Sequence, residues 1–138
     1  MPENIAPEMF EKWKEDLEKT WRRIPKAFRN EFTVRRTLQC HLYGCLQQLH
    51  LRVVADYLPP RVADRPIDLI AVREEREIVC AVCLENLVSL AAVKSLTSFE
   101  GGHKIIYTIG LLEKKVQESR FFLKPEVHHI HLRPFSDL

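Results

Sequence analysis

The sequence lacks the features that would mark several common classes of protein. No apolar run approaches the roughly 20 residues that a membrane-spanning helix needs. The beginning, MPENIAPEMFEKW, lacks the basic and then apolar pattern of a secretion signal, so we expect a cytoplasmic protein without membrane association. With 4 glycines and 8 prolines among 138 residues, a collagen-like or low-complexity chain is excluded. The GxxxxGK[ST] phosphate loop, the GxSxG nucleophile elbow and the HExxH zinc motif are also absent.

The composition is that of a folded domain. Hydrophobic residues make up 46% of the chain and charged residues 29%. A chain of 138 residues is long enough to bury a core without disulfides or structural metals. We therefore expect a single domain over residues 1–138. The net charge of +2 gives no overall attraction to polyanions.

Basic residues nevertheless concentrate in one segment. Six of them lie between positions 22 and 36, where Glu31 is the only acidic residue: Arg22, Arg23, Lys26, Arg29, Arg35 and Arg36. This local excess of +5, six basic residues less one acidic residue, could contact a phosphate backbone. The alternative is a solvated face, on which cations near a helix C-terminus complement the helix dipole.

Residues 8–24 have the periodicity of an amphipathic helix. Its apolar stripe recurs at steps of three and four residues: Phe10, Trp13, Leu17, Trp21 and Ile24. The stripe could pack on the core of its own domain, or it could contact a second copy of the chain. Because such an aromatic surface is seldom left in water, we expect a homodimer to which the 8–24 helix contributes.

The remaining chain predicts an α/β fold with a mixed central sheet of about five strands flanked by helices. We expect helices at 31–50, 86–99 and 111–123, and strands at 51–58, 66–72, 77–85, 103–110 and 127–135. Asn86 would cap the 86–99 helix, and Gly101 and Gly102 would close it. The expected core residues are Leu38, Leu42, Leu69, Val82, Leu84, Ile106 and Ile109.

The four cysteines do not have the spacing of a zinc or redox site. Cys80 and Cys83 lie in a predicted strand, where residues three apart face opposite sides. Cys40 and Cys45 are about 140° apart around a predicted helix. We therefore expect four buried thiols, no disulfide and no zinc.

The last predicted strand carries three histidines, in VHHIHL. On a strand, His129 and His131 share one face and His128 takes the other. A third and a fourth zinc ligand are not evident nearby, so these histidines predict an exposed face of an edge strand.

Two acidic residues lie in or beside apolar strands. Asp68 is inside PIDLI, and Glu85 ends the next strand. If the even-numbered turn REER closes a hairpin, Asp68 shares a face with Cys83 and Glu85. Two carboxylates on one face of neighbouring strands can hold a hard divalent cation such as Mg²⁺. Alternatively, Asp68 caps a turn or pairs with an arginine, and Glu85 simply ends its strand.

The order helix, three strands, helix and strand, with an aspartate in the second strand, resembles the PD-(D/E)xK nuclease superfamily. The resemblance covers about residues 28–110, in the segments NEFTVRRTLQCHLYGCLQQL, RPIDLIAV, IVCAVCLEN and KIIYTIG. It implies a restriction-endonuclease-like core, preceded by the 8–24 helix and followed by a C-terminal helix and strand in 111–138.

In that superfamily, an aspartate on the second strand and an acid on the third bind magnesium, and a lysine two residues later assists the attacking water. A glutamate of the first helix often joins them. Asp68 and Glu31 match the first and last of these positions, whereas Cys83 stands at the third-strand acid and Glu85 at the lysine. The resemblance thus implies Mg²⁺ bound by Asp68 and Glu85, with Lys94 from the following helix as the lysine. It implies a nucleic-acid-binding protein with weak or absent cleavage, the alternative being a non-enzymatic interaction or structural protein that keeps the fold.

Overall fold

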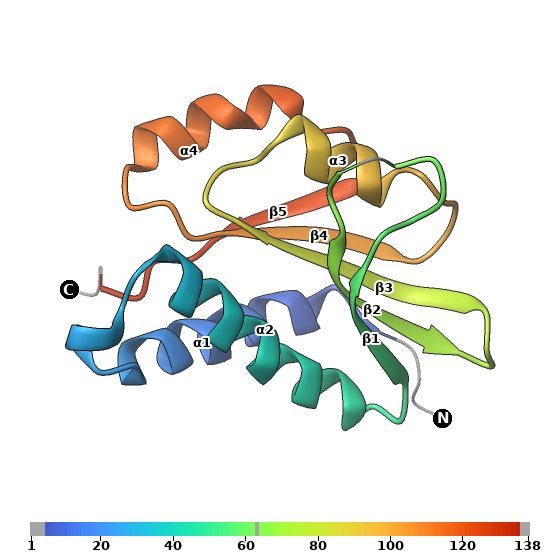
Figure 1. Cartoon of the computed structure of the whole chain (residues 1–138), viewed down its shortest axis with the longest axis horizontal. Helices are drawn as coiled ribbons and strands as arrows, with labels where there is room; N and C mark the ends of the chain where they lie inside the picture. The colour runs from blue at the N-terminus through green and yellow to red at the C-terminus, as the bar shows by residue number, and fades with distance from the viewer. Residues whose placement is uncertain (1–4, 63, 136–138) are drawn as a thin grey trace.

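The computed structural model describes residues 5–62 and 64–135, which form an α/β fold (Figure 1). Four α-helices are present in this part of the chain: α1 (Glu8–Arg23), α2 (Glu31–Gln47), α3 (Leu90–Leu96) and α4 (Glu113–Ser119). The strands are β1 (Arg52–Tyr57), β2 (Ile67–Arg73), β3 (Glu77–Glu85), β4 (His103–Thr108) and β5 (Val127–His131). Short 3₁₀ turns follow α1 and α4, at Lys26–Phe28 and Arg120–Phe122. None of the helices described is long and apolar enough to cross a bilayer.

The five strands make one mixed sheet in the order β1-β2-β3-β4-β5, which confirms the predicted class. β1, β2 and β3 are antiparallel neighbours, because short connections join them. β4 and β5 run parallel to β3, because α3 and α4 form the crossovers between them. The central strand β3 is buried from Val79 to Leu84, as its nearly continuous apolar run predicts.

Two helices cover each face of the sheet, α1 and α2 on one side and α3 and α4 on the other (Figure 1). The aromatic stripe of α1 is buried in the core beneath α1 and α2, and Phe10, Trp13 and Trp21 are each at most 5% exposed. The Tyr107 hydroxyl of β4 donates a hydrogen bond of 2.9 Å to the Phe10 carbonyl. The stripe therefore packs on its own chain, so the exposed patch that favours a homodimer through α1 is not present. The homodimer itself stays a prediction.

All seven expected core residues are buried, none more than 4% exposed. The expectation for the cysteines is only half right. Cys80 and Cys83 are buried in opposite faces of the sheet, but Cys45 is half-buried and Cys40 is exposed. The reason is that α2 buries one stripe, which includes Leu38 and Leu42. Cys45 packs against this core with only part of its surface, and Cys40 is outside the stripe.

The third helix begins later than predicted. Ser89 is its N-cap, and the Ser89 hydroxyl accepts a 3.1 Å hydrogen bond from the Ala92 amide. Asn86 does not cap it, because Asn86 and Leu87 form a bend directly after β3 and the helix begins only at Leu90. The Asn86 carbonyl accepts instead from the Gly110 amide at 2.9 Å. The helix ends at Leu96 with Thr97 as its C-cap, so Gly101 and Gly102 do not close it. Gly102 lies instead in the turn before β4, where its φ is 77° and a Cβ would lie 2.5 Å from the Ile78 carbonyl oxygen.

The histidines of β5 correct another expectation. β5 is an edge strand, and His129 and His131 share a face, as predicted. That face is not open, however. His131 is only 7% exposed, and both rings lie 2.9 Å from the Thr108 hydroxyl. The 3₁₀ turn after α4 covers this face, and its Arg120 guanidinium lies 2.7 Å from the His129 ring.

Candidate functional site

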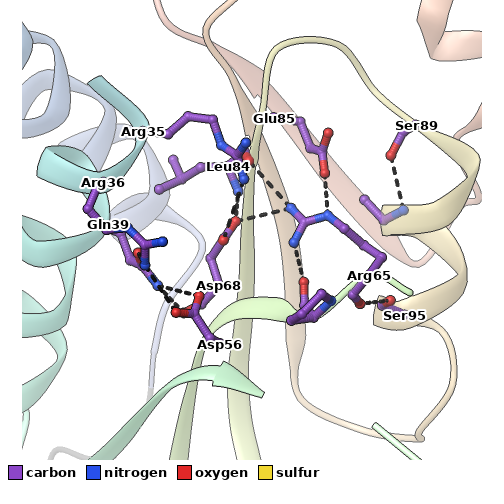
Figure 2. A network of polar contacts seen from close by, with 12 residues as sticks. Arg35, Arg36, Gln39, Asp56, Arg65, Asp68, Leu84, Glu85, Ser89 and Ser95 are labelled. Carbon is purple, nitrogen blue, oxygen red and sulfur yellow. Dashed lines mark hydrogen bonds and ion pairs between the residues drawn. The ribbon is translucent and has the colours of Figure 1, made fainter. Parts of the chain in front are cut away.

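The candidate site lies where β2 and β3 meet the N-terminal half of α2 (Figure 2). Leu69 pairs with Val82 and Ile70 with Ala81, a register that places Asp68 beside Cys83 and on the face of Glu85. Asp68 is 6% exposed. Its Oδ2 accepts a 2.6 Å hydrogen bond from the Leu84 amide, so β3 itself holds this carboxylate in place.

Arg65 lies between the two carboxylates (Figure 2). Its Nη2 is 3.1 Å from Asp68 Oδ2, and its Nε donates to Glu85 Oε2. Its Nη1 donates to the Pro66 carbonyl. Arg65 therefore supplies the positive charge between two acids that would otherwise repel each other, and the arginine alternative for Asp68 is the one observed. We call Arg65, Asp68 and Glu85 the carboxylate cluster.

The connection between β1 and β2 positions Arg65. Pro66 follows it directly before β2, and the Ser95 hydroxyl of α3 donates to the Arg65 carbonyl. Sequence reasoning missed this arginine. The available signal is its position three residues before Asp68, but a loop rich in proline does not reveal where its side chains point.

Burial changes the acid–base properties of the cluster. Burial raises the pKa of Glu85, and the charge of Arg65 opposes that rise. Burial likewise raises the pKa of Cys83 to about 12. Cys83, at the position of the superfamily's third-strand acid, is therefore a neutral thiol and a poor ligand for a hard cation.

Helix α2 is tied to the cluster through Gln39. Its Nε2 donates to the Asp68 carbonyl at 2.8 Å and to Asp56 Oδ1 at 2.9 Å. Arg36 Nη1 also reaches Asp56, at 3.0 Å from Oδ2. Partial burial acts to raise the pKa of Asp56, but these hydrogen bonds from Gln39 and Arg36 outweigh it, so the pKa is lowered. Asp56 is thus an ionised partner that keeps Arg36 beside the cluster.

A cavity of about 390 Å³ opens beside the cluster. Its lining is Phe32, Arg35, Arg36, Gln39, Asp56, Arg65, Pro66 and Asp68. Arg35 Nη2 is 3.9 Å from Asp68 Oδ1, while the buried Arg35 Nε has no hydrogen-bond partner among the described residues. Phe32 is 65% exposed, and the Arg36 guanidinium lies 5.5 Å from the centre of its ring. The cavity thus combines arginine donors with an exposed aromatic face.

Two of the predicted catalytic residues lie elsewhere. Glu31 is exposed in the first turn of α2 and lines a different cavity, of about 670 Å³. Lys94 is exposed on α3 and lines a third cavity, beside Arg61. The structure therefore brings Asp68 and Glu85 together but does not bring Glu31 or Lys94 to them. Their helices turn these side chains toward other surfaces, which helix spacing alone does not decide.

The six predicted nucleic-acid-binding residues divide into three groups. Arg22 and Arg29 are used within the fold, since they donate to main-chain carbonyls at 2.9 and 2.8 Å. Arg23 and Lys26 are exposed at the end of α1 and the turn after it. The other two, Arg35 and Arg36, line the cavity beside Asp68. The basic run therefore does not act as one surface.

The order helix, three strands, helix and strand, on which the resemblance to the PD-(D/E)xK superfamily rests, is present in the fold. The acidic pair implied by that resemblance is also present, with Arg65 between its members. Membership of the superfamily stays a prediction. Comparison of the chain with models of protein families, with curated proteins and with solved structures gives no match.

Proposed function

We propose that this protein binds nucleic acid on a nuclease-like scaffold and does not cleave it by a magnesium-dependent mechanism. The position of Arg65 carries the proposal. A magnesium ion needs oxygen ligands at 2.0–2.1 Å in near-octahedral geometry. Asp68 Oδ2 already accepts from Arg65 and from the Leu84 amide, and Glu85 accepts from Arg65. The guanidinium thus takes the place between the carboxylates that a metal ion would need.

The cavity beside the cluster supports the binding part of the proposal. An arginine fork matches the geometry of phosphate oxygens, and two arginines, Arg35 and Arg36, line this cavity. Exposed aromatic rings provide platforms for bases, and Phe32 is such a ring at the same cavity. Arginines beside an aromatic ring are typical of sites for unpaired strands.

The cleavage part is tested by incubating the protein with plasmid and single-stranded DNA in Mg²⁺ or Mn²⁺. We expect no cleavage above that of a mock preparation. Cleavage that depends on the metal and disappears in Asp68→Asn would overturn this part. The variant Arg65→Gln should be measured beside it. This variant removes the guanidinium that pairs with Asp68 and Glu85, so it should bind Mn²⁺ where the original protein does not.

The binding part is tested by fluorescence anisotropy with labelled single- and double-stranded oligonucleotides across a salt series. The double variant Arg35→Gln, Arg36→Gln should reduce the slope of log affinity against log salt by about 1.4–1.8, because each arginine paired with a phosphate contributes about 0.7–0.9 to that slope. The matched control is Arg52→Gln, Arg76→Gln, two exposed arginines outside this cavity. No binding at about 50 mM salt, or equal reductions in the two double variants, would contradict the proposal.

A second candidate is a non-enzymatic interaction protein whose partner is a second copy. The observation that favours it is the 670 Å³ cavity, lined by Trp21, Leu111, Leu112 and Phe135 among others. Leu111 and Leu112 are 78% and 67% exposed, and such apolar groups around a cavity are typical of protein contacts. Light scattering would then give roughly twice 16.2 kDa, and Leu111→Lys with Leu112→Lys would restore the single mass. A mass of one chain in the original protein would remove this candidate.

A further inference from the structure

A second group of ligand-type side chains lies between α1 and α2. Asp16 belongs to α1, and His41 and Cys45 belong to α2. One donor atom from each residue, a carboxylate oxygen, a ring nitrogen and the sulfur, lies within 4.8 Å of the other two. All three side chains are half-buried. We call these residues the interhelical cluster.

The local sequence explains why these side chains meet. His41 and Cys45 are four residues apart on α2, a spacing that places two side chains one above the other on the same helix face. The helices α1 and α2 are joined by a short turn and share one apolar core, in which Leu17 and Leu42 are fully buried. This packing brings Asp16 opposite the HxxxC pair of α2.

The distances suit a tetrahedral metal ion. With zinc–sulfur and zinc–nitrogen bonds of about 2.3 and 2.0–2.1 Å, a tetrahedral ion separates its sulfur and nitrogen ligands by about 3.5 Å. Cys45 Sγ and His41 Nε2 are 3.5 Å apart. The Asp16 oxygen lies within 4.8 Å of both atoms, so a rotation of its side chain toward them would bring it to the same ion. The donor set of one sulfur, one nitrogen and one oxygen is one that zinc uses and magnesium does not.

The interhelical cluster differs from the carboxylate cluster in how its acidic side chain is paired. Among the described residues, no salt bridge pairs Asp16 with a lysine or an arginine, whereas Asp68 and Glu85 both pair with Arg65. A divalent cation would compensate both a thiolate and a carboxylate here.

We propose that Asp16, His41 and Cys45 bind one transition-metal ion of the zinc class. On binding, the Cys45 thiol releases its proton to solvent and the thiolate sulfur coordinates the ion, together with neutral His41 and ionised Asp16. Three protein ligands leave the fourth tetrahedral position to water. The ion would also join α1 to α2, so that binding stabilises the fold.

The test is a titration of the reduced, metal-free protein with Co²⁺, which reports a thiolate ligand through sulfur-to-metal charge-transfer absorption. We expect one equivalent to bind and Zn²⁺ to displace it. Cys45→Ser should lose the absorption, and His41→Gln and Asp16→Asn should each weaken binding by at least about tenfold. The matched control is Cys40→Ser, an exposed cysteine on the same helix, which should behave as the original protein does.

Circular dichroism of each variant separates loss of the site from loss of the fold. As a second measurement, Zn²⁺ should raise the melting temperature of the original protein and of Cys40→Ser, but not of Cys45→Ser, and a chelator should reverse the rise. The proposal is overturned if the original protein shows no charge-transfer band, or if the band survives in folded Cys45→Ser. Full affinity in Asp16→Asn also contradicts it, because the carboxylate would then not be a ligand.

Discussion

The carboxylate cluster and the interhelical cluster both gather potential metal ligands, but they differ in what already neutralises them. Asp68 and Glu85 share Arg65, and Asp68 also accepts from the Leu84 amide. In the interhelical cluster, the sulfur of Cys45 has His41 as a neighbour and a carboxylate nearby. Ligand-type residues on one face therefore do not make a metal site by themselves, because a neighbouring cationic side chain can take the ion's place.

The largest expected effect comes from removing the internal cation. Arg65→Met should lower the free energy of unfolding by about 3–5 kcal/mol, because it leaves two largely buried carboxylates without their partner. Chemical denaturation at neutral pH measures the change. Adding Asp68→Asn and Glu85→Gln to this variant should recover part of the loss, because these changes remove the uncompensated charges.

The control for this experiment is an exposed ion pair. Arg52 and Glu75 are paired with side chains 73% and 72% exposed, so Arg52→Met should change the free energy of unfolding by at most about 1 kcal/mol. Equal effects of Arg65→Met and Arg52→Met would mean that Arg65 is not an essential cation. The contrast between the two clusters would then fail.

The next largest effect distinguishes the two clusters by metal. Zn²⁺ at about 100 times its dissociation constant should stabilise the protein by about 2.7 kcal/mol. Mg²⁺ should give no such gain, because Arg65 already lies between the two hard carboxylates. Thermal unfolding with each ion measures this. Asp68→Asn should still be stabilised by Zn²⁺. If Mg²⁺ stabilises the original protein and this stabilisation is lost in Asp68→Asn, the carboxylate cluster is a metal site and the contrast between the two clusters is wrong.

A smaller effect of pH should arise away from both clusters, at β5. Burial and then the charge of Arg120 lower the pKa of His129 to about 4, and burial and then Arg133 lower the pKa of His131. The unfolded chain, with histidine pKa values near about 6.5, therefore takes up protons first. In metal-free protein, the contribution of these two neutral histidines to the free energy of unfolding should be complete above about pH 6.5. It should decrease as the pH falls toward about 4.

Denaturation at several pH values in this window checks the expectation. His129→Asn should flatten the dependence, because it removes the histidine with the lowered pKa of about 4. His50→Gln, which alters an exposed histidine just after α2, is the matched control and should leave the slope as it is. A slope that His129→Asn leaves unchanged would assign the pH response to other groups.

The smallest effects are expected for the two predicted catalytic residues that lie outside the carboxylate cluster. Glu31→Gln and Lys94→Ala should each change the free energy of unfolding by no more than about 0.5 kcal/mol, because both side chains are exposed. Neither should alter oligonucleotide affinity as the Arg35 and Arg36 variants do. A comparable loss of oligonucleotide affinity in either variant would mean that the residue belongs to the nucleic-acid-binding site after all.

Local pattern predicted most of the fold. Apolar residues at steps of three or four and at steps of two mark which face of each helix or strand is buried, so the five strands and the seven core residues were predictable. The shared face of Asp68 and Glu85 follows from the same alternation along neighbouring strands. The boundary of α3 was less predictable, because Asn86 and Ser89 are both acceptable caps and only the path of the chain after β3 selects Ser89.

The α/β class, the buried faces and the position of two acids on one face thus follow from the sequence, because they depend on residues close together in the chain. The groups that surround the two acids depend instead on how distant segments pack together. Arg65 and Glu85 are 20 residues apart, and they meet because the loop before β2 is held against α3. In the same way, the packing of α1 on α2 buried the aromatic stripe within the chain and brought Asp16 to His41 and Cys45. Charge balance and ligand geometry depend on distances between separate elements, which no local pattern encodes.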